Sequence, residues 1–181
     1  MRKILALSGS LSGNSSNTEL LRAAARLGKD RAAIEVYQGM SSLPLFNVDF
    51  DVSPPPTPVS DFRERLSGCD GILISSPEYA HGISGVLKNA LDWTVSSGEF
   101  YQKPVAIFNA SPRATIAQES LAEVLRTMGA RIVEEAAIAV PLLGRHLNAD
   151  GIMAEVAIAE SVRSAIGAFL DAIDIIETIR S

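Results

Sequence analysis

The chain has 181 residues, of which 47% are hydrophobic and 20% are charged, and its formal net charge is -5. This length and composition suit one globular domain, which we expect over residues 1–181. The negative charge argues against nucleic acid and anionic membrane surfaces as partners.

The cysteine content and the hydropathy of the chain exclude several classes of protein. Cys69 is the single cysteine, which excludes an internal disulfide and a cysteine-based metal cluster, and no metal site is expected. The apolar run at residues 4–7 ends at Ser8, too early for a signal peptide, and no run has the length of a transmembrane helix. We therefore expect a cytoplasmic protein with no membrane partner.

Short apolar segments alternate with segments of helical periodicity along the chain. We expect strands at residues 3–8, 33–37, 71–75, 104–109 and 131–140. We expect helices at residues 16–27, 59–66, 83–94, 115–128 and 155–179. Residues 39–58 hold five of the nine prolines and are expected to form a long loop. Short strands that alternate with helices predict an α/β fold, a doubly wound three-layer sandwich around a parallel sheet.

Three of the expected strands are followed by loops of unusual composition. The first strand leads into SGSLSGNSSN, the third into SPEYAHG and the fourth into ASPRAT. Ligands of doubly wound sheets bind beyond the carboxyl ends of the strands, where the strand order reverses. The convergence of these loops at one edge of the sheet predicts a binding site there.

The first loop is suited to an anion, although residues 6–21 contain no Lys or Arg. It matches neither the Walker pattern, nor the dinucleotide fingerprint, nor the nucleophile elbow G-x-S-x-G. Backbone amides, a helix N-terminus and hydroxyl groups can together hold a phosphate monoester. The candidate residues are Ser8, Ser10, Ser12, Ser15, Ser16, Asn17 and Thr18. Two alternatives stay open: a solvated turn, and a capping box over residues 16–19 in which Ser16 caps the helix.

The second and third loops are suited to a flat aromatic ligand. The candidates are Pro77, Glu78, Tyr79, Ala80, His81 and Gly82 in the second loop, and Ser111 and Arg113 in the third. The alternatives are ordinary turns, with Tyr79 packed on the protein. His81 has no partnered Ser or Cys motif, so no catalytic residue is assigned. Cys69 is expected to be a small buried hydrophobe, and Trp93 to pack in the core or at an interface.

These segments resemble the NAD(P)H-dependent FMN reductase family. GSLSGNSSN is similar to the family's phosphate loop G-S-x-R-x-x-S-x-N, with matches at Gly9, Ser10, Ser15 and Asn17. Residues 76–93, SPEYAHGISGVLKNALDW, are similar to the family's block P-E-Y-N-x-x-x-x-x-L-K-N-A-[IL]-D-W, and residues 103–112 to the following strand and loop. The resemblance covers residues 2–140. Two departures stand out, because Ser12 replaces an arginine and Ala80-His81 replaces Asn-Gly.

The resemblance implies a flavodoxin-like fold with five parallel strands in the order 2-1-3-4-5. It implies FMN as the cofactor, with the phosphate in the first loop and the isoalloxazine ring against the second and third. NADPH or NADH would be the electron donor, and a flavin, quinone or similar small molecule the acceptor. Self-association as a dimer or tetramer is implied as well.

Three hypotheses of function follow. The first is an FMN-dependent NAD(P)H oxidoreductase that passes hydride from NAD(P)H to bound FMN and then reduces a small acceptor. The second is a non-catalytic flavin-binding carrier or redox-responsive interaction protein, and the third a hydrolase that uses Ser10 or Ser15 with His81. Residues 53–58 are expected to cover the cleft or, with an exposed Trp93 region, to support self-association.

Overall fold

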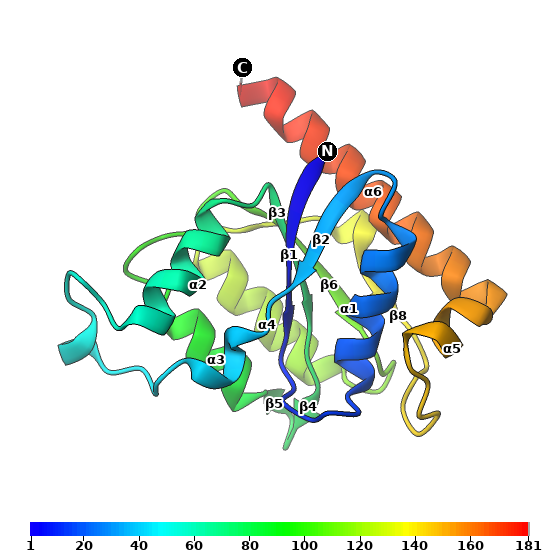
Figure 1. Cartoon of the computed structure of the whole chain (residues 1–181), viewed down its shortest axis with the longest axis horizontal. Helices are drawn as coiled ribbons and strands as arrows, with labels where there is room; N and C mark the ends of the chain where they lie inside the picture. The colour runs from blue at the N-terminus through cyan, green and yellow to red at the C-terminus, as the bar shows by residue number, and fades with distance from the viewer. Residues whose placement is uncertain (181) are drawn as a thin grey trace.

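The computed structural model describes residues 1–180, which form a central parallel sheet with helices on both faces (Figure 1). The sheet strands are β1 (Arg2–Ser8), β2 (Ala32–Val36), β3 (Gly71–Ser75), β6 (Pro104–Asn109), β7 (Arg131–Ile132) and β8 (Ile138–Ala139). Their order is β2-β1-β3-β6-β7, with β8 also paired to β6. The expected order 2-1-3-4-5 is confirmed, since β6 is the fourth predicted strand and β7 with β8 the fifth.

Two groups of helices cover the two faces of the sheet (Figure 1). On one face lie α1 (Ser16–Leu27), α5 (Ala149–Ala154) and α6 (Val156–Arg180). On the other lie α2 (Thr57–Ser67), α3 (Gly85–Asp92) and α4 (Thr115–Thr127). Within residues 1–180, no helix is both long and apolar enough to span a membrane.

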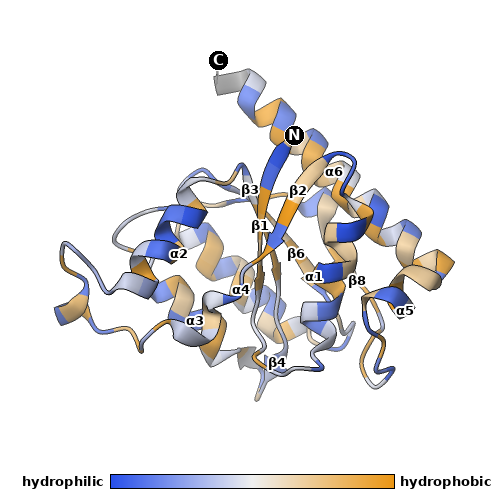
Figure 2. Ribbon diagram, viewed as in Figure 1, coloured by the Kyte–Doolittle hydropathy of each residue, from blue (hydrophilic) through white to orange (hydrophobic). Residues whose placement is uncertain are grey.

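The central strands β1, β3 and β6 contain continuous apolar runs because both faces of the sheet are covered there. Along β1 the side chains alternate between the two cores, with Ile4 and Ala6 packed on the α1 side and Leu5 and Leu7 on the α3 side. Figure 2 shows the resulting band of apolar colour through the middle of the molecule.

The expected fifth strand at residues 131–140 is wrong as a continuous element. It is divided into β7 and β8 by a 3-10 turn, Glu134–Ala136. Glu134 and Glu135 are both exposed. In a continuous strand one of these two carboxylates would point toward the core, which is costly. The edge segment therefore leaves β6 after Ile132 and pairs with it again at Ile138, beyond residues 133–137.

The expected helix at residues 83–94 starts too early. A hairpin of β4 (Glu78–Tyr79) and β5 (Gly82–Ile83) precedes the helix. Ile83, the expected first residue of the helix, therefore belongs to a strand. Helix α3 begins after Ser84, whose Oγ accepts a hydrogen bond from the backbone of Leu87 at 3.2 Å. An N-cap at this position fixes the start of the helix.

The expected loop at residues 39–58 is partly structured and is held down by α3. It contains the 3-10 helices Gly39–Ser42 and Val48–Phe50 and ends where α2 begins. The Pro44 carbonyl accepts from Asn89 Nδ2 at 2.9 Å and from Trp93 Nε1 at 2.8 Å. Trp93 is fully buried, so the expectation of an exposed Trp93 region is wrong and its packing role in the core is confirmed.

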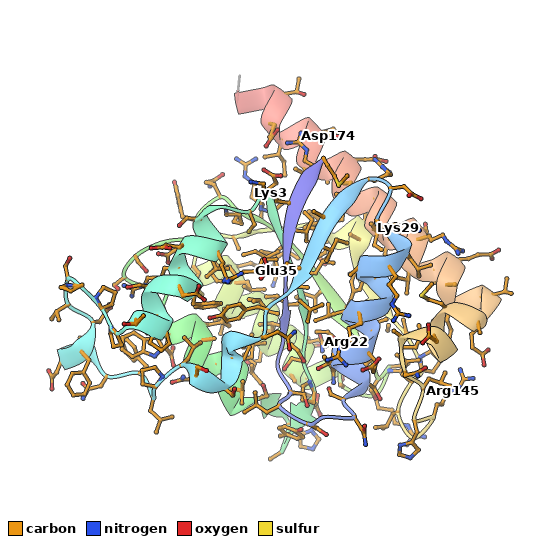
Figure 3. All side chains as sticks on the ribbon, viewed as in Figure 1. Lys3, Arg22, Lys29, Glu35, Arg145 and Asp174 are labelled. Carbon is orange, nitrogen blue, oxygen red and sulfur yellow. The ribbon has the colours of Figure 1, made fainter. Side chains whose placement is uncertain are left out.

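The long helix expected at residues 155–179 is confirmed as α6, Val156–Arg180. The short helix α5, Ala149–Ala154, was not predicted, and the extended backbone of Glu155 separates it from α6. Buried apolar residues such as Val162, Ile166 and Phe169 pack α6 against the sheet. At its end, Asp174 pairs with Arg2 of β1 at 2.6 Å (Asp174 in Figure 3).

Candidate functional site

A cleft of about 420 Å³ lies at the carboxyl ends of β1, β3 and β6. These strand ends are in the lower part of Figure 1. The three loops singled out in the sequence meet here. The predicted residues that line the cleft are Ser10, Ser12, Ser15, Ser16, Asn17, Pro77, Glu78, Tyr79, Ser111 and Arg113.

Five predicted residues lie elsewhere: Ser8, Thr18, Ala80, His81 and Gly82. Five others line the cleft but were not predicted: Ser76, Asn109, Ala110, Ala114 and Leu143. Asn109 ends the fourth strand and Ala110 follows it, so both could have been found from that position alone. Leu143 comes from a distant segment that no sequence pattern marks. Residues 53–58 do not line the cleft, so the expected cover is not formed by them.

Gly9 brings the first loop against the second. Its backbone amide donates to the Ser75 carbonyl oxygen at 2.8 Å. A Cβ at this position would lie 2.2 Å from Ser76 Oγ, so no larger residue fits. The close approach places the two loops on either side of the cleft floor.

The helix that follows the first loop is capped by Ser15, which corrects the expected capping by Ser16. Ser15 has an extended backbone, and its Oγ accepts from the Thr18 amide at 3.3 Å. Glu19 does not reach back to complete a capping box, because its Oε2 accepts from the Ala149 amide at the start of α5 at 2.7 Å.

Several amides of this loop are left without a protein acceptor. In the described chain, the backbone N–H groups of Leu11 and of residues 13–17 donate to no protein atom. Unpaired amides at a helix N-terminus, with the positive end of the helix dipole, form an anion site.

Asn17 is oriented by Ser75 at the end of β3. It is 9% exposed, and its Oδ1 accepts from Ser75 Oγ at 2.9 Å. This bond leaves Nδ2 as the group of Asn17 that can donate to a ligand in the cleft.

Ser8 and Thr18 support the loop from below. Their hydroxyl oxygens are 2.7 Å apart, and both residues line a separate hollow on the β2 side of the loop. Arg22 lines that same hollow, projects from the middle of α1 and pairs with Glu19 (Arg22 in Figure 3). We therefore place Ser8 and Thr18 in the scaffold of the loop.

Glu78 connects the hairpin to α4. Its Oε2 accepts from the Ala117 amide at 2.9 Å, where α4 has no side-chain cap of its own. Its Oε1 lies 3.1 Å from His81 Nδ1. Because both oxygens are engaged by the protein, Glu78 fixes the wall of the cleft.

The structure does not assemble a hydrolytic site from the expected residues. His81 is exposed and contacts Glu78, and its ring is hydrogen-bonded to neither Ser10 nor Ser15. A nucleophile within hydrogen-bond reach of a base is the signature of such a site.

The cleft carries little charge. Arg113 is the one cation among the described residues that line it, and it is exposed and forms no ion pair there. No cluster of three or more His, Cys, Asp or Glu residues suited to a metal occurs in residues 1–180.

Two groups with shifted pKa values lie outside the cleft. Burial raises the pKa of the Cys69 thiol, which fits the expected role of a buried small hydrophobe. Burial and the neighbouring Asp61 raise the pKa of Tyr37 to about 12. Neither group is poised for chemistry at neutral pH.

Comparison with known proteins decides the family. A family model described as NADPH-dependent FMN reductase matches residues 2–142, which is more than half of the chain. The chain belongs to the NADPH-dependent FMN reductase family. An NAD(P)H-dependent FMN reductase from Pseudomonas aeruginosa is 40% identical over 111 residues, which cover 60% of this chain and 60% of that protein. A 2-hydroxy-1,4-benzoquinone reductase from Burkholderia sp is 30% identical over 93% of this chain and 92% of its own length.

Solved structures agree with this family. The flavoenzyme FerB, an NAD(P)H:(acceptor) oxidoreductase from Paracoccus denitrificans, superposes with a TM-score of 0.85 and 25% identity, covering 96% of this chain and 98% of its own. A flavodoxin, WrbA-like protein from Agrobacterium tumefaciens superposes with a TM-score of 0.61 and 14% identity, covering 96% and 98%. The flavodoxin-like fold is therefore confirmed.

Proposed function

We propose that this member of the FMN reductase family is an FMN-dependent NAD(P)H oxidoreductase that reduces a small acceptor such as a quinone or a flavin. The observation that carries the proposal is the set of unpaired amides in the first loop, next to the free Nδ2 of Asn17. The loop lies between β1 and β3, where the strand order reverses. This is the place at which flavodoxin-like sheets bind FMN.

The hydrogen-bond donors of the first loop suit a phosphate monoester that stays bound and is not transferred to another molecule. Amides, serine hydroxyls and a helix N-terminus supply several donors, and none of them is a mobile side-chain cation. We propose that Ser10, Ser12, Ser15, Ser16 and Asn17 hold the phosphate of FMN. Ser8 and Thr18 would act by supporting this loop.

The remaining walls fit a flat ring. Pro77 and Tyr79 come from the second loop, and Ser111 and Arg113 from the third. Their backbone groups can meet the polar edge of an isoalloxazine ring. Ala80, His81 and Gly82 would act through the shape of the hairpin that carries Tyr79. A cleft of about 420 Å³ is within the usual range for cofactor sites.

When bound, FMN supplies the redox chemistry, accepting hydride from NADPH or NADH and passing electrons to the acceptor. The protein's own part is to position the ring and to leave one side open. Tyr79 is 60% exposed, so the mouth of the cleft is accessible to a donor and then to an acceptor. The absence of an acid–base pair in the described cleft is consistent with this division of work. The names of the Burkholderia and Paracoccus relatives support a quinone or other small molecule as acceptor.

Flavin titration tests the proposal directly. Added FMN should shift and sharpen its absorbance bands, and riboflavin, which lacks the phosphate, should bind more weakly. NADPH or NADH should then be consumed in the presence of a quinone or free flavin. A chain that does not perturb the FMN spectrum would overturn the proposal.

The carrier hypothesis remains a distinct candidate, because the same donor set would hold FMN in a protein without turnover. It predicts tight FMN binding with negligible NAD(P)H oxidation across several acceptors. The accessible mouth of the cleft favours the enzyme.

We also propose self-association through the loop that precedes α2. Leu45, Val48 and Phe50 expose 85%, 70% and 60% of their surface, and Figure 2 shows apolar colour on this projecting loop. Leu45→Asp combined with Phe50→Asp should lower the mass measured by sedimentation velocity. Ile175→Asp, at an equally exposed apolar position on α6, is the matched control. An unchanged mass in the loop variant would contradict this interface.

A cytoplasmic location is proposed because NADPH and NADH are intracellular donors. Cell fractionation with an antibody to the chain would test it. Recovery of the protein outside the cytoplasmic fraction would contradict the proposal.

A further inference from the structure

A small hollow of about 260 Å³ adjoins the cleft proposed to hold FMN, which we call the cofactor cleft. We call the small hollow the side pocket, and it is lined by Ser111, Pro112, Arg113, Pro141 and Leu143. Ser111, Arg113 and Leu143 also line the cofactor cleft, so the two hollows share a wall. A molecule that lies over the mouth of the cofactor cleft can therefore extend into the side pocket.

The wall shared by the two hollows carries a positive charge. Arg113 is the only charged residue among the described residues that line the side pocket. In the cofactor cleft the other charged residue is Glu78, whose two oxygens are engaged by Ala117 and His81. The junction of the two hollows therefore favours an anion, although the chain as a whole has a formal charge of -5.

The guanidinium of Arg113 is free to bind that anion. Among the arginines at residues 1–178, whose side chains the structure describes, only Arg113 and Arg163 form neither a hydrogen bond nor an ion pair through the side chain. The planar fork of N–H donors in arginine matches the oxygens of a phosphate. Arg163 lies exposed on α6 and lines neither hollow, so it represents an ordinary surface arginine.

The third loop holds Arg113 at the tip of a short turn. The Ala114 amide donates to the Ser111 carbonyl oxygen at 2.9 Å, and Pro112 and Arg113 lie between them. Proline favours the first central position of a turn because its φ is fixed. Asn109 closes the base of the turn, since its Nδ2 donates to the Ala114 carbonyl oxygen at 3.2 Å and its Oδ1 accepts from the Ser111 amide at 2.8 Å. The backbone of Arg113 is therefore held in place without a ligand, and only its side chain has to become ordered on binding.

The electron donor of the proposed reaction is the substrate that always brings an anion to this place. NADH and NADPH both carry a pyrophosphate, and NADPH carries a 2′-phosphate as well, whereas a quinone can be uncharged. Arg113 is the only cation among the described residues of the cofactor cleft that could meet these groups. The side pocket is smaller than a site that encloses a whole cofactor, and it suits a phosphate group of a longer molecule.

We propose that Arg113 binds a phosphate of the nicotinamide dinucleotide in the side pocket while the nicotinamide ring lies over the cofactor cleft. Arg113 thereby helps to determine which donors bind tightly. This assignment rests on the proposed function, because it identifies the anion with the electron donor of that function. Binding of a phosphate group by Arg113 itself does not require FMN.

Calorimetric titration of the full chain with NADP+ and NAD+, the oxidised donors, tests the proposal without turnover. Saturating FMN is present, so that the first loop is occupied. Arg113→Gln should weaken NADP+ binding about tenfold, because the charge-assisted bond to phosphate is lost. Arg163→Gln, at the other unpaired arginine, is the matched control and should bind NADP+ as the natural chain does.

The second nucleotide identifies the phosphate. An equal loss for NAD+ would place the pyrophosphate at Arg113, and a loss for NADP+ alone would place the 2′-phosphate there. In both cases the loss should shrink as salt is added, since Arg113 is exposed. Arg113→Lys keeps the charge without the planar fork and should lie between the natural chain and Arg113→Gln.

Unchanged NADP+ affinity in Arg113→Gln, or an equal loss in Arg163→Gln, would overturn the proposal. A loss of FMN affinity as large as the loss of NADP+ affinity would overturn it too, because Arg113 would then act on the flavin. Anthraquinone-2-sulfonate tests the acceptor as the source of the anion. Weaker binding of this sulfonate to Arg113→Gln, with NADP+ binding unchanged, would assign Arg113 to the acceptor and contradict the proposal.

Backbone amide NMR separates a failure of this inference from a failure of the proposed function. A chain that binds FMN and oxidises NADPH, but whose NADP+ affinity is independent of Arg113, would remove this inference alone. A chain that does not perturb the FMN spectrum would remove the proposed function. If NADP+ still shifted the amides of Arg113 and Leu143 in that chain, and not the amide of Asn17, phosphate binding by Arg113 would be sustained.

Discussion

Asn17 and Ser12 are the residues of the first loop whose chemistry can be tested most sharply. Asn17 is held by Ser75 on one side and free to donate on the other. Ser12 is exposed at the lip of the cleft, where the family pattern has an arginine. Both residues are proposed to act on the phosphate of FMN. Riboflavin lacks this phosphate and therefore serves as a control ligand for each.

Asn17→Asp should lower FMN affinity at least about tenfold, or about 1.4 kcal/mol. The variant keeps an oxygen for Ser75 Oγ, but it replaces the free donor by a carboxylate oxygen that repels phosphate. Quenching of flavin fluorescence during titration measures the change. Riboflavin affinity should stay the same, and an equal loss for both flavins would show that Asn17 acts through the fold of the loop.

Ser12→Arg should raise FMN affinity about tenfold, because a guanidinium can form a charge-assisted bond to phosphate. The gain should shrink as salt is added, since the residue is exposed. Ser12→Gln is the neutral control of similar reach. A gain of the same size in Ser12→Gln, or for riboflavin, would contradict the electrostatic explanation.

At the scale of elements, the hairpin of β4 and β5 is formed by residues that do not favour its turn. Ala80 and His81 have φ values of 48° and 58°, in the left-handed region. Two-residue hairpin turns with positive φ at both positions favour Asn-Gly, the pair that the family pattern has here. The turn therefore keeps its shape at a cost of about 1 kcal/mol or more per residue.

Ala80→Asn with His81→Gly should stabilise the protein by about 1 to 2 kcal/mol through relief of this strain. For a chain of this size the melting temperature should rise by about 2–4 °C for each kcal/mol. Calorimetry on the double variant and the two single variants measures the gain. His81→Gly also removes the contact between His81 and Glu78, but this contact is exposed at His81 and contributes little to stability. An unchanged or lower melting temperature would therefore show that the turn is not strained.

The sequence predicted the main strands but not the two interruptions, for physical reasons. In the sequence, Ile83 continues the apolar spacing of α3. In the structure, the N-cap at Ser84 and the strained turn before it place Ile83 in β5. The segment at residues 131–140 is apolar at residues 132–133 and 136–140, and the exposed Glu134 and Glu135 between them mark where the strand is interrupted. Periodicity does not report where a cap or an exposed charge pair breaks an element.

The candidate site was predictable where a loop follows a strand. Ser10, Asn17 and Tyr79 line the cleft because parallel strands bring their ends to one edge. Leu143 could not be predicted, since its approach depends on how the segment after β8 returns across the sheet.

At the scale of the whole molecule, the parallel sheet with helices on both faces follows from the alternation of strands and helices, whereas the packing of the loop before α2 does not. That loop is tied to the α3 side of the molecule through Arg63, whose Nε donates to the Trp93 carbonyl oxygen at 2.9 Å. Arg63 Nη2 also pairs with Asp51 at 2.7 Å, and the Asp51 side chain is 9% exposed. Nothing in the spacing of these residues indicates that they meet.

Asp51 should make the stability of the whole molecule depend on acid pH. Hydrogen bonds from Ser96 and Arg63 hold the pKa of Asp51 below its usual value of about 3.8. Because the folded pKa is the lower one, the stabilisation is complete above the unfolded pKa and is lost as pH falls through the folded pKa. The free energy of unfolding in urea should therefore decline below pH of about 4.

Asp51→Asn tests this assignment in the same urea experiment, with the neutralisation of the exposed Asp49 as control. The variant should be less stable than the natural chain at pH 7, because Arg63, with 15% of its side chain exposed, loses its closest carboxylate. The difference between the two proteins should then narrow below pH of about 4, where Asp51 itself becomes protonated. Asp49→Asn should follow the natural chain at every pH. Curves for Asp51→Asn and the natural chain that stay parallel down to pH 3 would show that Asp51 does not set the acid limit of the fold.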